Sequence, residues 1–205
     1  MAKLLIATTN PAKLAEYRIL LERFDLELVS LREAGVDRQA PENGATFREN
    51  AQTKAAFYFV YSGLPTLADD GGLEVDALDG APGVMSHRWL GTEDVDDRTL
   101  AEAVINRMQG VEPKRRGARL RAAAALIYTH RGLVREALAE AALEGVVADS
   151  CYPQVRVGFP YRSVLYLPDR GRYLAEISEE EAAGISQRRA TVARLEPDLR
   201  RLAAR

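Results

Sequence analysis

The sequence predicts an α/β fold, and two observations support this prediction. An apolar run at 3–8 precedes helical spacing at 11–24 and a second apolar run at 26–30, which is the strand–helix–strand opening of an α/β domain. The chain has 205 residues, of which 47% are hydrophobic, and this is enough for one domain with a substantial core or for two tightly joined lobes.

The first helix is predicted from apolar residues at three- and four-residue spacing, namely Leu14, Tyr17, Leu20, Leu21 and Phe24. Pro11 ends the preceding strand and suits the first turn of a helix. A second helix is predicted at 46–61, where Thr46 and Glu49 fit a capping box.

The remaining elements follow the same logic. They are an apolar entry at 66–68, a strand at 73–78, a helix at 96–108, hairpin strands at 119–130 and 133–143 turned at Arg131-Gly132, a strand at 164–167, and helices at 178–183 and 187–203, the last interrupted near Pro197. The alanine content of the hairpin segments would also suit helices. We expect one domain of two lobes over 1–205, with the lobe junction near the polar loop 110–118.

Composition excludes several classes of protein. The formal net charge of −2 lacks the basic excess typical of a nucleic-acid binder. The single cysteine, Cys151, excludes an intrachain disulfide framework and a multi-cysteine zinc module. No apolar run reaches the length of about 18 residues that a membrane span needs. We therefore expect a cytoplasmic protein with no nucleic-acid or membrane partner.

The first candidate for chemistry is the segment Thr8-Thr9-Asn10-Pro11-Ala12-Lys13. It lies where a strand turns into a helix, and the backbone N–H groups there and the positive end of the helix dipole suit a phosphate. Lys13 would add a mobile positive charge. The alternative is an ordinary helix cap made by Asn10, with Lys13 solvated.

The second candidate is Asp69-Asp70-Gly71-Gly72. Two adjacent carboxylates at a strand end need a cation or hydrogen-bond donors if they are buried. Their hard oxygen ligands suit Mg²⁺, which usually takes one or two protein carboxylates together with waters and substrate phosphates. The alternative is an exposed turn, in which Asp and Gly are common.

The third candidate lies in and before the second helix. Asn50 and Lys54 are four residues apart and share one helix face. Glu42, in the preceding polar turn, and Asp69 or Asp70 could hold one metal ion while Lys54 contacts a phosphate oxygen. The alternative is a helix cap with a surface ion pair.

Taken together, three stretches resemble one family in order and spacing. They are Thr8-x-Asn10-x-x-Lys13, Phe47-x-Glu49-Asn50-Ala51-x-x-Lys54-Ala55, and Ala68-Asp69-Asp70-x-Gly72-Leu73-x-Val75-Asp76-x-Leu78-x-Gly80-x-Pro82-Gly83. The family is the inosine triphosphate pyrophosphatases, the Ham1/RdgB-like hydrolases of non-standard purine nucleotides. The resemblance is dense over 3–92 and more diffuse beyond.

The resemblance implies an ITPase-like (Maf/Ham1) fold: a long mixed β-sheet, helices on two lobes, and a central active-site cleft. It implies a homodimer that cleaves a nucleoside triphosphate to the monophosphate and diphosphate with Mg²⁺. The implied substrate contacts are Thr8, Thr9, Asn10, Lys13, Lys54 and Gly71, the last replacing the usual serine. Asp70 is implied as general base, supported by Asp69, and Glu42 and Asp70 as metal ligands.

The C-terminal half departs from the family pattern of Gly-Phe-Gly-Tyr-Asp-Pro, because the chain reads Gly158-Phe159-Pro160-Tyr161-Arg162-Ser163. Phe159 can still stack on a purine, and Tyr161 is retained, but Arg162 reverses the charge of the expected aspartate. Ser-His-Arg becomes Ser186-Gln187-Arg188, and an expected lysine is Ala182.

These departures concern base recognition and, at Ala182, one phosphate contact, whereas the residues for the metal and the attacking water lie in the retained half. We therefore expect hydrolysis of a phosphoanhydride, with Phe159, Tyr161 and Arg188 as substrate contacts. Two alternatives stay open. One is a nucleotide-binding or regulatory relative with weak or no hydrolysis, and the other is a pyrophosphatase of altered base specificity.

Overall fold

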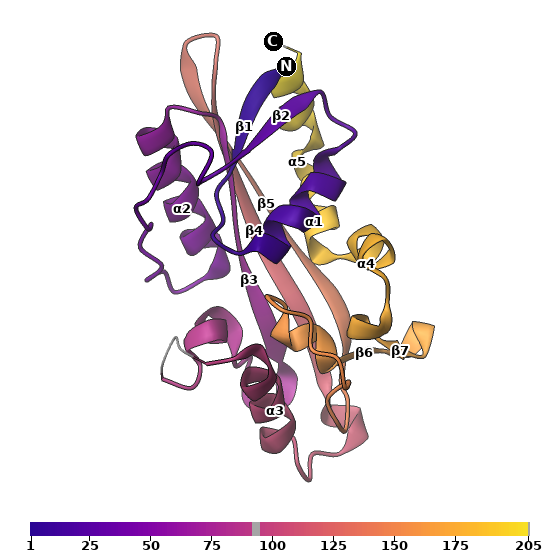
Figure 1. Cartoon of the computed structure of the whole chain (residues 1–205). Helices are drawn as coiled ribbons and strands as arrows, with labels where there is room; N and C mark the ends of the chain where they lie inside the picture. Colours follow the sequence, from indigo (N-terminus) through magenta and orange to yellow (C-terminus); the bar gives the residue numbers. More distant parts are fainter. Residues whose placement is uncertain (92–94, 205) are drawn as a thin grey trace. The chain divides into compact units, whose positions relative to one another are not determined.

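The computed structural model describes residues 1–91 and 95–204 and has a mixed seven-stranded sheet (Figure 1). In sheet order the strands are β2 (Leu26–Ser30), β1 (Ala2–Ile6), β3 (Thr66–Val75), β4 (Gly117–His130), β5 (Leu133–Val147), β6 (Leu165–Leu167) and β7 (Arg172–Tyr173). β1 pairs in parallel with β2 and β3, whereas β6 pairs antiparallel with β5 and β7. The α/β prediction is confirmed.

The helices are α1 (Pro11–Leu21), α2 (Phe47–Ser62), α3 (Asp97–Arg107), α4 (Glu179–Ile185) and α5 (Gln187–Ala203). Their first turns show why they begin where the sequence indicates. Asn10, Thr46, Asp96 and Ser178 are the N-cap residues of α1 to α4, and each accepts hydrogen bonds from N–H groups of the first turn. The predicted helices are therefore confirmed within a few residues.

The chain is divided into two compact units. Unit 1 comprises Met1–Asp70, Ala122–Ala141 and the chain from Gln187 onward; unit 2 comprises Gly71–Arg121 and Ala142–Ser186. β3, β4 and β5 contribute residues to both units.

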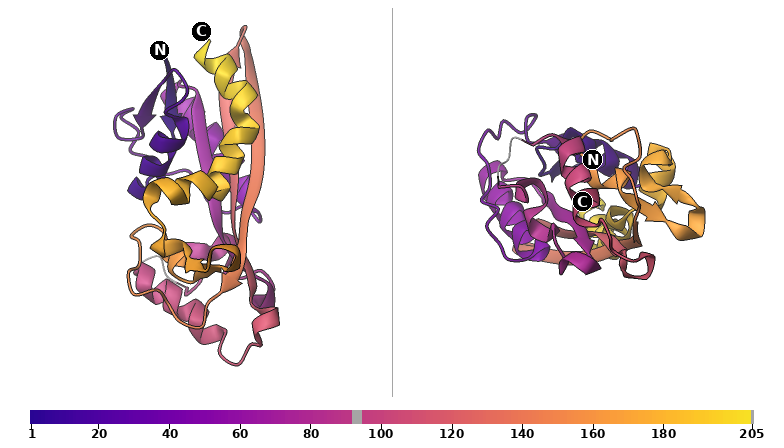
Figure 2. Two further views of the ribbon diagram at one scale, coloured as in Figure 1. Left: turned by 90° about the vertical axis from the view of Figure 1, so that its right-hand side faces the viewer. Right: turned by 90° about the horizontal axis from the view of Figure 1, so that it is seen from below.

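Unit 1 contains α1, α2, α5 and the tip of the β4–β5 hairpin. Arg131 and Gly132 turn the hairpin with φ of 50° and 77°, the backbone of a two-residue turn that matches strand twist. α5 runs alongside the hairpin (Figure 2), and the Tyr128 hydroxyl donates to Asp198 of α5 over 2.6 Å. The hairpin prediction is confirmed, and the helical alternative for these segments is wrong.

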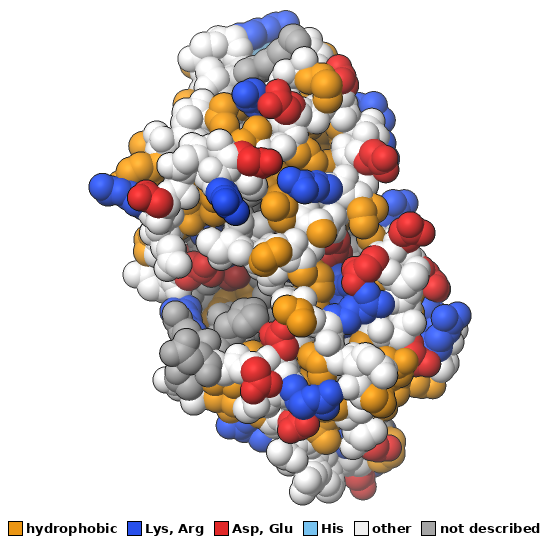
Figure 3. Space-filling view, viewed as in Figure 1, with side chains coloured by type: hydrophobic (Ala, Val, Ile, Leu, Met, Phe, Trp, Pro, Cys, Tyr) orange, Lys and Arg blue, Asp and Glu red, His pale blue; other side chains and the backbone are white. Residues whose placement is uncertain are grey.

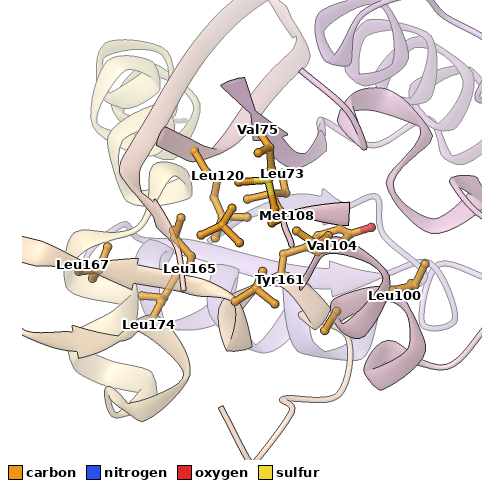
Figure 4. Close-up of a cluster of buried hydrophobic side chains, with 14 of the residues drawn as sticks. Leu73, Val75, Leu100, Val104, Met108, Leu120, Tyr161, Leu165, Leu167 and Leu174 are labelled. Carbon is orange, nitrogen blue, oxygen red and sulfur yellow. The ribbon is translucent and has the colours of Figure 1, made fainter. Parts of the chain in front are cut away.

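Unit 2 is built around an apolar cluster (Figure 4). Leucine and valine side chains from β3, α3 and β6 meet there with Met108, which follows α3, and Leu73, Val75, Leu100, Val104 and Leu165 are fully buried. Burial of an aliphatic side chain contributes about 1.5–3 kcal/mol, so this cluster is a main source of the stability of unit 2.

Three local predictions are wrong. The strand expected at 73–78 ends at Val75, and Asp76–Leu78 form a 3₁₀ helix. β3 is one continuous strand from Thr66 to Val75, so Asp69-Asp70-Gly71-Gly72 is neither a turn nor a strand end. α5 also continues through Pro197. Pro197 is exposed, so water can reach the carbonyl group that its missing N–H leaves unbonded, while buried leucines hold the helix on both sides: Leu195, Leu199 and Leu202.

Among the described residues, no helix has both the length and the apolar character needed to cross a membrane. On the described part of the face drawn in Figure 3, Lys and Arg side chains are interspersed with Asp and Glu. This mixture agrees with the near-neutral net charge of −2.

Candidate active site

Asp69 and Asp70 lie side by side in β3 and are buried, with exposed fractions of 2% and 8%. Successive residues of a strand point to opposite faces of the sheet. Asp69 therefore faces charged groups from α1 and α5, whereas Asp70 faces α2. One adjacent pair of carboxylates thus serves two separate sets of partners within unit 1.

On the Asp69 face, two cations contact the same carboxylate oxygen. The Lys13 Nζ lies 3.3 Å from Asp69 Oδ2, and Arg188 Nε donates to this oxygen over 2.8 Å. Arg188 also donates to Glu16 Oε2 over 3.2 Å. Asp69 Oδ1 is buried and has no hydrogen-bond partner among the described residues.

The electrostatics of this face follow from burial. Burial alone would raise the pKa of Asp69, but the positive charges of Lys13 and Arg188 outweigh it and hold that pKa well below its ordinary value. Burial is also the main reason that the pKa of Lys13 is lowered, and the charges of Arg188 and Lys54 lower it further. Lys13 is therefore a poorly solvated cation, which an additional anion would stabilise.

On the Asp70 face, one ammonium group links two carboxylates. The Lys54 Nζ lies 3.3 Å from Asp70 Oδ1 and 3.2 Å from Glu42 Oε2. Burial works against the charge of Lys54, but Asp70 and Glu42 outweigh it, so the pKa of Lys54 is raised. Asn50, one turn earlier on α2, donates from Nδ2 to Asp70 Oδ2 over 2.9 Å.

The segment before α1 has a cap and a charged contact together. Asn10 Oδ1 accepts from the N–H groups of Ala12 and Lys13 over 2.9 and 3.3 Å, and Thr8 Oγ1 accepts from Asn10 N. The cap that the sequence offered as an alternative is thus present, but Lys13 is not simply solvated, because it contacts Asp69. Thr9 is exposed. Phosphate binding by Thr8, Thr9 and Asn10 stays a prediction.

The other predicted substrate contacts lie in unit 2. Phe159 is half-buried, and the guanidinium carbon of Arg162 lies 3.9 Å from its ring centroid. Tyr161 is buried in the apolar cluster, where its hydroxyl donates to the Ser86 carbonyl over 2.6 Å. Gly71 is half-buried in β3.

Neighbouring Gly72 shows why that strand needs a residue without a side chain. A Cβ at position 72 would lie 1.8 Å from Ser86 Oγ and 2.8 Å from the Gly83 carbonyl oxygen. The 3₁₀ helix that carries Ser86, Gly83–Arg88, therefore packs directly against the backbone of β3.

The donor set of the Asp70 face fits a hard divalent cation. Glu42 and Asp70 already share one positive charge, that of Lys54, and two carboxylates are what Mg²⁺ commonly takes from a protein. Within residues 1–91 and 95–204, no three His, Cys, Asp or Glu side chains are grouped to hold a metal ion. Glu42 and Asp70 could supply two ligands to such a cation, with waters or substrate oxygens completing the set.

The structure places one more charged residue at the site that sequence reasoning missed. Glu16 is 2% exposed and pairs with Arg188. The sequence feature that could have identified Glu16 is its position three residues after Lys13, because residues at this spacing share one face of a helix. Arg188, predicted as a substrate contact, is 4% exposed, and its Nε and one terminal nitrogen donate to carboxylates.

By its fold and its site, the chain is an α/β protein with a mixed sheet in which two adjacent carboxylates are buried, each against a lysine. A family model described as the Ham1 family matches residues 4–198. The chain belongs to the Ham1 family.

Similar proteins cover nearly the whole chain. A protein from Yersinia pseudotuberculosis named dITP/XTP pyrophosphatase is 39% identical over 189 residues, which are 92% of this chain and 93% of that protein. One with the same name from Listeria monocytogenes is 36% identical, over 97% and 95% of the two chains. The solved structure of a HAM1 protein from Coxiella burnetii is 31% identical, covers 97% of this chain and 98% of its own, and has a TM-score of 0.83.

Proposed function

We propose that this chain hydrolyses nucleoside triphosphates to the monophosphate and diphosphate, with non-standard purine nucleotides such as dITP, XTP and ITP as substrates. The observation that carries the proposal is the pair Asp69 and Asp70, each buried in β3 against its own lysine. The names of relatives at 36–39% identity support the reaction and the substrate class.

Two lysines and two aspartates of the site have a part in the proposed reaction. Lys13 and Lys54 offset the negative charge of the phosphate chain and of the oxygen on which charge grows as the anhydride bond breaks. Asp70 orients the attacking water and accepts its proton. Asp69 keeps Lys13 protonated and placed, because opposite charges at 3.3 Å favour the ionised form of both.

Mg²⁺ is the cofactor that we propose, with Glu42 and Asp70 as its protein ligands. When bound, it supplies positive charge to phosphate oxygens and lowers the cost of bringing a polyphosphate next to carboxylates. The two proposed ligands come from different segments, since Asp70 belongs to β3 and Glu42 to the segment before α2.

Altered base specificity is a second candidate, and one observation in unit 2 favours it. The Arg162 guanidinium covers the Phe159 ring at 3.9 Å and pairs with Glu179 at 3.5 Å. The ring that the resemblance offers to a purine therefore already stacks on a cation. A base that accepts hydrogen bonds on the edge facing Arg162 would be preferred.

A nucleotide panel tests both candidates. The purified chain is incubated with Mg²⁺ and ITP, dITP, XTP, ATP, GTP and dUTP, and diphosphate and orthophosphate are measured separately. We expect diphosphate from the inosine and xanthosine nucleotides. Diphosphate from another base would favour the altered-specificity candidate, and binding without release of diphosphate from any nucleotide would favour a regulatory protein.

Four expectations implied by the sequence are proposed with this function: a homodimer, a cytoplasmic location, a central active-site cleft, and a lobe junction near 110–118. Light scattering coupled to size-exclusion chromatography tests the first of these.

A further inference from the structure

We propose that Asn50 is a positioning residue that sets the placement of Glu42 relative to Asp70, and so the affinity of the site for a divalent cation. This inference rests on the proposed function. It concerns a side chain that is 1% exposed and that connects the segment containing Gly44 to Asp70 of β3 by two hydrogen bonds.

The carboxamide of Asn50 uses both of its ends. Nδ2 donates to Asp70 Oδ2 over 2.9 Å, and Oδ1 accepts from the Gly44 N–H over 2.8 Å. An N–H group can only donate, so the Gly44 contact requires the oxygen on that side and the nitrogen on the Asp70 side. A carboxamide meets both needs, whereas a carboxylate or a hydrocarbon of the same size leaves at least one partner unsatisfied.

Gly44 lies two residues after Glu42, so this hydrogen bond holds the turn that carries Glu42. The same turn is held at its other side, where Ala40 N donates to the Tyr58 hydroxyl of α2 over 3.2 Å. Glu42 is the more exposed partner of Lys54, with 47% of its side chain exposed against 12% for Asp70. Its position therefore depends on how the turn is fixed to α2.

The close approach also explains the glycine at position 44. A Cβ there would lie 2.8 Å from Asn50 Oδ1 and 2.8 Å from Glu49 Cβ. An alanine would push the turn away from α2 or displace the carboxamide. Asn50 and Gly44 are therefore two ends of one connection, and each can be tested without the other.

The experiment compares Asn50→Ala, Gly44→Ala and the double variant with the wild type. Gln52→Ala is the matched control, since it removes a carboxamide from the same helix that contacts Glu136 rather than the site. Mg²⁺ is titrated calorimetrically without nucleotide, kcat and KM are measured with the best substrate of the panel, and a melting curve reports folding.

Losing a buried hydrogen bond to a charged group should weaken Mg²⁺ binding by about tenfold in Asn50→Ala. We expect kcat to fall by at least about tenfold with a smaller change in KM, because the reacting groups rather than substrate contacts are displaced. Gly44→Ala should change the same two quantities in the same direction. The double variant should be little worse than Asn50→Ala, since both substitutions cut one connection.

A folded Asn50→Ala with wild-type Mg²⁺ affinity and kcat would overturn the inference, as would equal losses in Gln52→Ala or additive losses in the double variant. If Asn50→Ala does not fold, Gly44→Ala decides by the same criteria. A wild type that binds Mg²⁺ but releases diphosphate from no nucleotide contradicts the proposed function alone, and the titration still decides the role of Asn50. A wild type that binds no Mg²⁺ overturns the inference.

Discussion

Arg188 of unit 1 and Arg162 of unit 2 are equally buried, each with 4% of its surface exposed, but their partners differ. Arg188 contacts Asp69 and Glu16, whose side chains are each 1% exposed. Arg162 pairs with Glu179, whose side chain is 54% exposed, and lies over the Phe159 ring. The two arginines are equally buried but differ in the exposure of their partners. Arg188 neutralises carboxylates that water cannot reach, whereas Glu179 would be solvated if Arg162 were removed.

The same contrast runs through the two units. Unit 1 buries carboxylates and cations against one another on both faces of β3, which is costly unless every charge is matched. Unit 2 buries an apolar cluster and keeps its charged pairs near solvent. We infer that catalytic chemistry depends on unit 1 and that unit 2 tunes selectivity, and the following substitutions test this division.

The largest effect is expected for Asp70→Asn in unit 1. The amide keeps the shape of the side chain but cannot accept a proton or balance Lys54, so diphosphate release should fall about 10³-fold. The melting temperature should fall less than in Arg188→Leu, because Glu42 still pairs with Lys54 and the amide oxygen can still accept from Asn50. Exposed Asp169 of unit 2 provides the control, as Asp169→Asn should leave the rate unchanged. Full activity of Asp70→Asn would reject the assignment of the general base.

The next effect concerns stability. Arg188→Leu leaves Glu16 and part of the charge of Asp69 uncompensated in the interior, which should lower the free energy of unfolding by about 3–5 kcal/mol. The control on the same helix is Arg200→Leu, which removes a surface pair with Glu196 and should cost less than about 0.5 kcal/mol. Urea unfolding of both variants measures the difference. Equal losses would show that burial of the charges in unit 1 is not what makes Arg188 different.

Much of this architecture could be predicted from local sequence. Apolar spacing and the cap residues Asn10 and Thr46 located the helices, because a cap acts within three residues of the chain. The strand at Asp69-Asp70 could not be predicted, since Asp and Gly disfavour strands. It exists because cations from α1, α2 and α5 compensate both carboxylates, and those helices are distant in sequence.

The site itself divides in the same way. Lys54 and Asn50 could be placed on one helix face from their spacing alone. The contacts of Arg188 with Asp69 and Glu16 could not be predicted, because they depend on how α5 packs against β3 and α1. No local sequence pattern determines that packing. Glu16 was within reach of a spacing argument, but a lone glutamate on a helix is ordinarily a solvated residue.

A smaller effect is expected from the titration of Asp69. Its pKa is below the ordinary value in the folded chain because Lys13 and Arg188 outweigh burial. The unfolded chain therefore binds a proton first as the pH falls, so the stabilisation is complete above about pH 5 and is lost on further acidification, by up to about 1.4 kcal/mol per pH unit. Urea unfolding between pH 6 and pH 3 should show a shallower loss for Asp69→Asn than for the wild type. Parallel curves would contradict the assignment of this dependence to Asp69.

A small change in stability is expected for Arg162→Leu, and this variant separates the two units most directly. Glu179 can be solvated when its partner is removed, and leucine still packs on the Phe159 ring, so the loss should be about 1 kcal/mol or less. The rate on the best substrate should stay within about tenfold, while the ratio of kcat/KM values between inosine and other purine nucleotides should change, since a hydrogen-bonding group near Phe159 is lost. Arg170→Leu, which removes an exposed pair with Glu181 in the same unit, should leave that ratio unchanged. A loss of stability as large as that of Arg188→Leu would mean that the stability of unit 2 also depends on a buried ion pair. The proposed contrast between the two units would then be wrong for Arg162.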